Sequence, residues 1–378
     1  MDKMDGGLLL LDFAENLFQD VKLEDTLVIA CQHILETNYI MFNYLFGKGL
    51  SPKNTFLIGK CYSTNKETLE KFKKKGVYIH KGSTAYNSHL SFDEQFGEEI
   101  IDFINHINNK VNLTKYAKVI LVDDGGYLIY WANNLLKNHR NLVAIEQTSS
   151  GYVKLKEIKL SFPVINIARS NAKLNFESPF IADTAVIKLK NQLKNLNATP
   201  EKVLIIGAGS IGSQIFKILK DDFDVKRYDL IKKDSDIKIE KFKSLLGQFD
   251  LIIGCTGESV ISKEDYGLLK KGAILVSVSS SDREFSSSNL RKILPKNNDC
   301  HKNLIINGIT LVNSGFPVNF DGLKHSAKPE LIQLTRALIF SGVCLANKES
   351  YSNSLIDLDK DIQEKLVKEF KSMKTNKK

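Results

Sequence analysis

The front half of the chain alternates short apolar runs with segments in which apolar residues recur every three or four positions. The apolar runs are 26–35, 54–60, 76–80, 118–126 and 142–151. The segments between them, such as NKETLEKFKKKG, have the helical period. Strands that alternate with helices pair in parallel, so this half is expected to form an α/β layered domain.

The alternation resumes after a long helical pattern at 180–196 and the polar segment NATPEK. Five further apolar runs follow, VLIIGAG, DVKRYDLI, FDLIIGCTG, AILVSVSS and LIINGITLVNSG, before a helical C-terminal part. We predict an α/β fold with two doubly wound domains. They are a substrate-binding domain over 1–182 and a central Rossmann dinucleotide-binding domain over 183–330. Helices over 331–378 are expected to return to the first domain.

Polar side chains directly follow several of the front apolar runs. They are His33, Asp123, Asp124, Glu146 and Gln147. In parallel α/β sheets, ligands bind in the crevice outside the carboxyl ends of the strands. These side chains are therefore candidates for a binding or catalytic site.

Composition and charge argue against several other classes of function. The formal net charge is +9, and the excess lysines are scattered over helical patterns or gathered in KEFKSMKTNKK. No aromatic residues interleave a basic stripe, so we expect a solvated lysine-rich surface and no nucleic-acid partner. The five cysteines are far apart and form no CxxC motif, which indicates neither a metal site nor a disulfide framework.

The location of the protein is predicted from two absent signals and the scattered cysteines. The opening MDKMDGGLLLLDF holds a four-leucine run between aspartates, which is too short for the apolar region of a signal peptide. No apolar stretch in the sequence approaches the roughly 20 residues of a membrane span. We therefore expect a cytoplasmic protein with no membrane partner.

A glycine-rich loop opens the second half of the chain. It is GAGSIG, with Gly207, Gly209, Ser210, Ile211 and Gly212 as the expected cofactor contacts. The three glycines permit a tight turn, close approach of a pyrophosphate and close packing of helix on strand. Asp229 lies at the end of the next apolar run, where a carboxylate bonds a ribose hydroxyl and favours NAD over NADP. NAD is the predicted cofactor; the alternative is a glycine-rich turn that binds no ligand.

Several motifs, in order, resemble the S-adenosylhomocysteine hydrolase (adenosylhomocysteinase) family over roughly residues 26 to 345. In the front half the matching segments are CQHILET, CYSTN, DDGGYL, EQTSSG and FPVINIARSNAKLNFES. In the second half they are GAGSIG, CTG at 255–257 and LVN at 311–313. The resemblance implies a front domain that holds a nucleoside and a middle domain that holds NAD+ permanently.

The chemistry of that family is a hydrolysis without net redox. The cofactor oxidises the ribose 3′-hydroxyl, the C4′ proton is removed, the 5′ thiol group is eliminated, water adds and the ketone is reduced again. The resemblance implies that Lys173 lies beside the oxidised hydroxyl, that Asp124 is the base at C4′ and that His33 assists departure at C5′. Glu177 matches a carboxylate that is an aspartate in the family. By spacing alone, Lys173 and Glu177 form an ordinary i,i+4 ion pair.

The resemblance also implies binding residues. For the substrate these are Glu36, Thr37 and Gln147. For the cofactor, beyond the glycine loop and Asp229, they are Thr148, Ser149, Ser150, Thr256, Gly257 and Asn313.

The chain departs from the family where the substrate is recognised. Gln147 stands in place of a glutamate, and an amide can hydrogen-bond a hydroxyl but cannot take a proton. Leu35 replaces a threonine, and Ser280 replaces a histidine on the homocysteine side. In the family, a segment after the position of LVN closes over the adenine; this chain has FPVNFDGL there. In the family, the C-terminal tail of one subunit completes the NAD site of the neighbouring subunit; this chain has a lysine-rich segment instead. Because unpaired buried polar groups decide specificity, these changes favour a substrate other than S-adenosylhomocysteine.

Two classes of function are weighed. The first is an NAD-dependent hydrolase or lyase that transiently oxidises a sugar hydroxyl of a small, nucleoside-like substrate. The alternative is a non-catalytic NAD-binding sensor or partner protein of the same fold. A simple dehydrogenase with net redox is a further alternative. A homodimer and a homotetramer both stay open.

Overall fold

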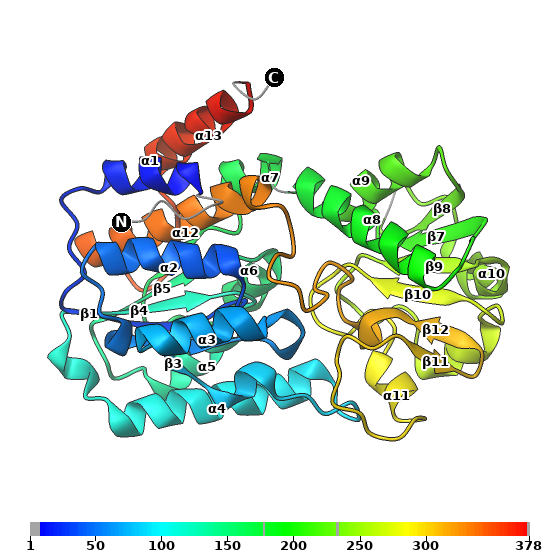
Figure 1. The fold of residues 1–378 in the computed structure, drawn as a ribbon, viewed down its shortest axis with the longest axis horizontal. Coiled ribbons are helices and arrows are strands. Elements are labelled where there is room, and N and C mark those ends of the chain that lie inside the picture. The colour runs from blue at the N-terminus through cyan, green and yellow to red at the C-terminus, as the bar shows by residue number, and fades with distance from the viewer. Residues whose placement is uncertain (1–7, 177, 232–233, 376–378) are drawn as a thin grey trace. The chain divides into compact units, whose positions relative to one another are not determined.

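The computed structural model describes residues 8–176, 178–231 and 234–375 (Figure 1). The chain divides into two compact units. Unit 1 comprises 1–85, 96–177 and 328–378, and unit 2 comprises 86–95 and 178–327. The orange and red C-terminal helices therefore belong to the same unit as the blue and cyan N-terminal elements (Figure 1).

Unit 1 is built on a seven-stranded parallel sheet in the order β13-β6-β5-β4-β1-β2-β3. The strands are β1 Thr26–Cys31, β2 Thr55–Ile58, β3 Tyr78–Ile79, β4 Lys118–Asp123, β5 Leu142–Glu146, β6 Val164–Asn166 and β13 Leu355–Asp357. The five predicted front strands are confirmed, and each is shorter than its apolar run. Their last residues leave the sheet at its carboxyl edge, where the polar side chains gather.

Helices cover this sheet, and one of them, α12 (Pro329–Lys348), is largely buried between the sheet and other helices. The helices of unit 1 are α1 Leu9–Leu17, α2 Glu36–Gly47, α3 Lys66–Lys75, α5 Tyr127–Leu135, α6 Ser149–Lys156, α7 Asn171–Phe176, α12 Pro329–Lys348 and α13 Lys360–Thr375, together with α4 Phe92–Lys110 from residue 96 on. Helix α12 packs against α1, α2, β4 and β5. Among the described residues it is the one helix long and apolar enough to cross a membrane, and 78% of that apolar window is buried inside the protein.

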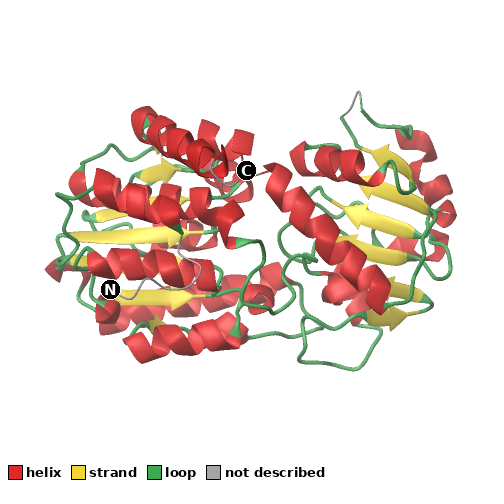
Figure 2. Cartoon of the chain, turned by 45° about the horizontal axis from the view of Figure 1, so that its top comes forward, coloured by secondary structure: helices red, strands yellow, loops and turns green. Residues whose placement is uncertain are grey.

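Unit 2 holds a second, six-stranded sheet in the order β11-β12-β10-β9-β7-β8. Its strands are β7 Lys202–Ile206, β8 Asp224–Tyr228, β9 Leu251–Gly254, β10 Ile274–Ser277, β11 Leu304–Ile306 and β12 Ile309–Leu311. Its helices are α8 Ser178–Asn195, α9 Ser210–Leu219, α10 Phe242–Leu245 and α11 Ser287–Arg291. In both units the strands run between helices (Figure 2), so the fold is α/β with two doubly wound units, as predicted.

The last predicted run of unit 2 is a hairpin. Strands β11 and β12 pair antiparallel, whereas the other neighbours in this sheet are parallel. The turn between them is Asn307–Gly308, and both residues have positive φ, 52° and 79°. An Asn-Gly pair with this backbone is the favoured two-residue hairpin turn.

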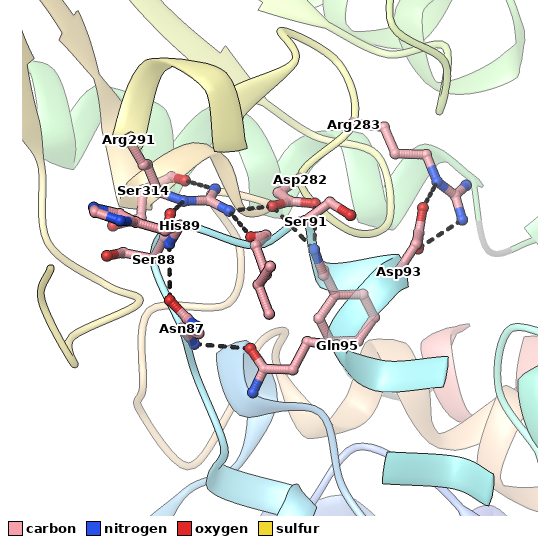
Figure 3. A network of polar contacts seen from close by, with 12 residues as sticks. Asn87, Ser88, His89, Ser91, Asp93, Gln95, Asp282, Arg283, Arg291 and Ser314 are labelled. Carbon is pink, nitrogen blue, oxygen red and sulfur yellow. Dashed lines mark hydrogen bonds and ion pairs between the residues drawn. The ribbon is translucent and has the colours of Figure 1, made fainter. Parts of the chain in front are cut away.

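The ten-residue segment 86–95 belongs to unit 2 although its neighbours in sequence belong to unit 1. Arg291 holds it in place: this side chain is 1% exposed and donates to the carbonyls of Ser88 and Leu90, each at 2.8 Å (Figure 3). Arg291 is also paired with buried Asp282 at 2.5 Å, and Asp282 accepts from the backbone N–H of Phe92 at 3.1 Å. A buried ion pair whose remaining donors and acceptors meet backbone groups fixes this segment on unit 2.

Candidate active site at the carboxyl edge of the unit 1 sheet

Two rows of polar side chains lie at the carboxyl ends of β1, β4 and β5. The register pairs Cys31 with Asp123 and Asp123 with Glu146, so these three side chains share one face of the sheet. The residue that follows each strand is one step further along the chain and is expected to point to the opposite face. The second row is therefore Gln32, Asp124 and Gln147. Ionisable side chains therefore lie on both faces of the sheet at its carboxyl edge: Asp123 and Glu146 on one face and Asp124 on the other.

Asp124 is the centre of the second row. Its Oδ1 accepts from Lys60 Nζ at 2.5 Å, and its Oδ2 accepts from His33 Nε2 at 3.2 Å. Gln147 Nε2 donates to the same Oδ2 at 2.5 Å, and Gln147 Oε1 accepts from Gln32 Nε2 at 3.0 Å. The predicted residues His33, Asp124 and Gln147 are thus brought together in one buried network.

Charge in this network is set by burial and by Lys60. Burial raises the pKa of Asp124, but His33 and Lys60 stabilise its charged form by more, so its pKa lies well below the usual range. Burial lowers the pKa of Lys60, and the Asp124 carboxylate raises it by more, so that Lys60 stays protonated. Asp124 is consequently an ion-paired carboxylate at neutral pH.

His33 links Asp124 to a serine. Its Nδ1 lies 2.5 Å from Ser63 Oγ, on the opposite side of the ring from Asp124. Burial lowers the pKa of His33, so the ring is neutral at neutral pH. Because an ionised carboxylate can only accept, Nε2 carries the hydrogen and Nδ1 accepts from the Ser63 hydroxyl. This line of groups can pass a proton from Ser63 through the ring to Asp124.

Lys173 reaches the same edge from α7. Its Nζ donates to the backbone carbonyl of Gln147, and its side chain is half-buried. The lysine is therefore next to the second row. Glu177, predicted to act with it, lies outside the described residues.

Two predicted substrate residues have partners within unit 1. Glu36 begins α2 and is paired with Lys71 at 2.9 Å. Thr37 is buried, and its hydroxyl accepts from Arg336 Nε at 3.3 Å. Each contact joins α2 to another helix, α3 through Lys71 and α12 through Arg336. If Glu36 and Thr37 bind a substrate, they do so in addition to this structural role.

The three hydroxyl residues after β5 begin helix α6. Thr148 is its N-cap and accepts from the backbone N–H of Gly151 at 3.0 Å. Its own hydroxyl donates to Glu146 Oε1 at 2.6 Å. Ser149 and Ser150 are exposed on the first turn. Thr148 thus serves the loop geometry, while the two serines are available to a ligand.

The glycine loop of unit 2 fits a dinucleotide pyrophosphate. Gly207 has φ +103°, and a Cβ at Gly212 would lie 1.9 Å from the Gly207 carbonyl oxygen. A Cβ at Gly209 would meet nothing within 4 Å, so this glycine faces open space. Gly209 is also the N-cap of α9 and supplies no side-chain cap, so the helix N–H groups with Ser210 and Ile211 can bind an anion. The glycines at 207 and 212 are required by the fold, and the one at 209 leaves room for a ligand.

Asp229 stands one residue beyond β8, as the dinucleotide hypothesis requires. Its Oδ2 accepts from the backbone N–H of Ala208 at 2.7 Å, and its Oδ1 accepts from that of Ile231 at 3.0 Å. The carboxylate is half-buried at the end of the strand next to the glycine loop. A carboxylate oxygen can accept more than one hydrogen bond, so these two bonds do not by themselves exclude a ribose hydroxyl.

The loop after β9 is shaped by a glutamate that the motif analysis did not single out. Glu284 is 1% exposed and accepts from the backbone N–H of Gly257 at 2.6 Å and from Thr256 Oγ1 at 2.9 Å. Burial raises the pKa of Glu284. The predicted cofactor residues Thr256 and Gly257 are therefore held by this carboxylate.

Asn313, a predicted cofactor contact, has several hydrogen-bond partners within unit 2. It is buried, and its Nδ2 donates to the carbonyls of Pro317 and Phe320, each at 2.9 Å. Its Oδ1 lies 3.1 Å from His301 Nδ1. Both polar atoms of Asn313 thus have partners inside unit 2, which gives the residue a structural role.

Lys60 is one of the site residues that sequence analysis missed. It follows β2 by two residues, just as His33 follows β1, so the strand-end rule that found His33 would also have found Lys60. Its positive charge pairs with Asp124 and lowers the pKa of that carboxyl group. This pairing is visible only in the folded structure.

One cluster in unit 1 has the residue types of a metal site. His80, Glu99 and Asp102 bring ligand atoms within 4.8 Å of one another. The backbone N–H of Gly82 donates to His80 Nδ1 at 3.2 Å, which places the ring hydrogen on Nε2, where it is donated to Asp102 at 3.2 Å. A neutral imidazole has one lone pair, and here Gly82 takes it. The cluster is accounted for by these hydrogen bonds.

Comparison with known proteins finds uncharacterised relatives and distant enzymes. No protein-family model matches the chain. Uncharacterised proteins of two Mycobacterium tuberculosis strains, CDC 1551 / Oshkosh and ATCC 25618 / H37Rv, are each 38% identical over 334 residues, 87% of this chain and 66% of the relative. The chain therefore spans about two thirds of the length of these relatives.

Adenosylhomocysteinase of Sulfolobus acidocaldarius is 22% identical over 222 residues, 55% of this chain and 52% of that enzyme. Adenosylhomocysteinase of Thermococcus kodakarensis is 24% identical over 193 residues, 46% of this chain and 45% of that enzyme.

Solved structures show only a loose likeness. A dipicolinate synthase chain from Bacillus halodurans has 11% identity and a TM-score of 0.42, covering 87% of this chain and 100% of that one. D-isomer specific 2-hydroxyacid dehydrogenase from Lactobacillus delbrueckii ssp. bulgaricus has 13% identity and a TM-score of 0.39, over the same shares. By its own sheet topology the chain is an α/β protein with a Rossmann-type unit. It has a distant, partial sequence similarity to adenosylhomocysteinase.

Proposed function

We propose that this protein is an NAD-dependent enzyme that transiently oxidises a hydroxyl of a nucleoside or related sugar conjugate, so that a neighbouring group can be eliminated or hydrolysed. The supporting observation is the buried network of Asp124, His33 and Lys60, with Lys173 reaching the same sheet edge. The proposal keeps the adenosylhomocysteinase type of chemistry but assigns it a different substrate.

Gly207, Gly209, Gly212 and Asp229 would hold NAD in unit 2, as their geometry allows. When bound, NAD would supply reversible acceptance of a hydride. In unit 1, Lys173 would hold the proton of the hydroxyl being oxidised, because its amine lies at the edge of the network. Asp124 would take a proton from the carbon next to the resulting carbonyl.

The charge of Asp124 limits what it can do as a base. A carboxylate whose pKa is held below the usual range accepts a proton only from an acid strengthened by its surroundings, such as a carbon beside a carbonyl. His33 donates its Nε2 hydrogen to Asp124 and accepts from Ser63 at Nδ1, so the ring holds the carboxylate in place and can pass a proton from Ser63 toward it.

A substrate other than S-adenosylhomocysteine is supported by the second row itself. Gln147 is neutral, and both of its amide atoms are already bonded to Asp124 and Gln32. A ligand hydroxyl bound beside the second row would meet the Gln147 amide and the Lys60–Asp124 ion pair. We propose a small, nucleoside-like substrate on this basis.

The alternative proposal is a non-catalytic NAD-binding protein. Asp124 favours it, since three donors from Lys60, Gln147 and His33 already occupy its two oxygens. In this case NAD is bound and no substrate reduces it. The two proposals differ in what happens in unit 1, so both can be tested on the same preparation.

The first test separates cofactor binding from folding. Purified protein is denatured, and released NAD+ and NADH are quantified for wild type, Gly209→Ala and Gly267→Ala. At both glycines an added Cβ meets nothing within 4 Å, so both variants should fold. We expect near-stoichiometric NAD in wild type and Gly267→Ala, and little in Gly209→Ala. Equal NAD in the two variants, or none in wild type, contradicts the cofactor site.

The second test addresses the chemistry. Wild type, Lys173→Ala and Lys156→Ala are incubated with a panel of nucleosides and sugar conjugates, and conversion of bound NAD+ to NADH is measured. Lys156 is exposed at the end of α6 and serves as the matched control. Reduction by one compound in wild type and Lys156→Ala, lost in Lys173→Ala, supports the enzyme. Bound NAD that no compound reduces supports the alternative.

A further inference from the structure

Behind the candidate site lie two buried acids that the proposed chemistry does not use. Asp123 ends β4 and Glu146 ends β5, and the two are register partners in the parallel sheet. Register partners share one face, so their side chains are neighbours on the face opposite Asp124 and Gln147. Both residues are 0% exposed.

Each acid has one bonded oxygen and one without a partner. Asp123 Oδ2 accepts from the backbone N–H of Ile129 at 2.8 Å. Glu146 Oε1 accepts from the backbone N–H groups of Gly125 at 3.3 Å and Thr148 at 2.6 Å. Asp123 Oδ1 and Glu146 Oε2 find no hydrogen-bond partner within the part of the chain that the structure describes. A buried acceptor without a partner is unfavourable, so two such atoms on neighbouring acids call for a common explanation.

The groups around the pair favour one proton between them. Burial, above all, and the neighbouring Asp123 raise the pKa of Glu146 to about 8. Burial raises the pKa of Asp123 to about 6, against the bond from Ile129 and the charges of Lys60 and Lys154. The remaining titratable neighbours, Asp124 and the Cys31 thiol, add no further cation to this face. Two interacting carboxyl groups of this kind titrate as a pair.

We infer that Asp123 and Glu146 share one proton, held between Asp123 Oδ1 and Glu146 Oε2, and that this proton fixes the two loops that carry Asp124 and Gln147. The acid hydrogen donates to the other acid's oxygen, which satisfies both atoms with a single bond. A metal ion would be a poorer occupant, since hard cations take about six or more oxygens and this face offers two.

The link to the candidate site runs through Glu146 Oε1. That oxygen bonds Gly125, the residue after Asp124, and Thr148, the residue after Gln147. Loss of the shared proton would leave two buried negative charges on neighbouring strands and would loosen both loops. Glu146 and Asp123 are thus positioning residues for the site. This second part rests on the proposed function, whereas the shared proton does not.

The test uses the full-length protein without substrate. The infrared band of a protonated carboxyl group is followed from pH 5 to pH 9 in wild type, Glu146→Gln and Glu98→Gln. Glu98 is exposed on α4 and is the matched control. We expect a band at pH 7 in wild type and Glu98→Gln that disappears above about pH 8, and no such band in Glu146→Gln. Its absence from wild type at pH 7 overturns the shared proton.

Stability provides an independent readout of the same proton. The folded pair binds more protons than the unfolded chain between the ordinary acid pKa values and their raised ones, so stability should fall as pH rises from about 5 to about 8. In Glu146→Gln the side-chain amide donates where the proton was, and the urea midpoint of unit 1 should lose this slope. An unchanged slope, or a midpoint that depends on whether potassium, sodium or choline is the salt cation, contradicts the inference.

Hydrogen exchange tests the positioning role. In Glu146→Ala, exchange of the backbone amides of Gly125 and Thr148 should accelerate about tenfold or more, because both amides lose a buried hydrogen-bond acceptor. Glu146→Gln should preserve their protection at pH 7. If both variants exchange like wild type, the loops do not depend on the pair, and the proposed function stands or falls separately on cofactor reduction.

Discussion

Replacing Lys60 with methionine tests the electrostatic core of the candidate site. The lysine and Asp124 side chains are only 3% and 6% exposed, and Nζ lies 2.5 Å from Oδ1. At an effective dielectric constant of about 20, the attraction at this distance is about 6–7 kcal/mol, and the cost of burying the lysine offsets part of it. Removing one partner of a buried pair typically costs about 3–5 kcal/mol, and we expect Lys60→Met to fall in this range at pH 7.

The loss should depend on pH in a defined direction. In wild type the pKa of Asp124 is depressed, so its contribution to stability is present above its ordinary pKa and is lost as pH falls through the folded value. Without Lys60, burial raises the pKa of Asp124, and the variant gains by taking up a proton as pH falls. The difference between wild type and variant should therefore shrink from pH 7 to pH 5.

The single tryptophan makes the assay specific for unit 1. Trp131 lies half-buried on α5, so its fluorescence during urea denaturation follows the unit that carries the site. The double variant Lys60→Met/Asp124→Asn should recover at least half of the loss, since no buried charge is left alone. A loss that is independent of pH, or a double variant no more stable than Lys60→Met, would refute the reasoning.

Three further predictions concern other buried groups. Arg291→Met should destabilise unit 2 by about 3–5 kcal/mol and speed hydrogen exchange in segment 86–95, while Lys292→Met, at an exposed position, should do neither. Equal exchange in the two variants would show that Arg291 does not anchor the segment. Glu284→Ala should lower the NAD retained after gel filtration, because Gly257 and Thr256 lose their common acceptor; exposed Glu258→Ala is the control, and equal retention argues against this role. Burial lowers the pKa of His33, so its ring should titrate by NMR below the ordinary value of about 6.5, and a midpoint at or above that value contradicts a neutral histidine in the network.

The sequence by itself determined the layers of the fold and the strand ends where the site lies. Alternation of apolar runs with helical patterns is a short-range property, and it located β1 to β5 and the glycine loop, because periodicity and backbone requirements act within a few residues. The strand-end rule likewise identified His33, Asp124 and Gln147 as candidates.

Only the tertiary structure decided which of these groups meet and in what charge state. The order β5-β4-β1-β2 brings Gln147, Asp124 and Lys60 together from distant parts of the sequence. Nothing in the apolar pattern indicates that segment 86–95 belongs to unit 2 or that both polar atoms of Asn313 bond inside it. Long-range strand pairing and burial set these partners. The charges of His33 and Lys60 then lower the pKa of Asp124, whereas burial raises the pKa of Glu146 and lowers that of His33. Since a charged side chain has the same sequence signature whether it is solvated or paired in the interior, its role follows from its neighbours in space.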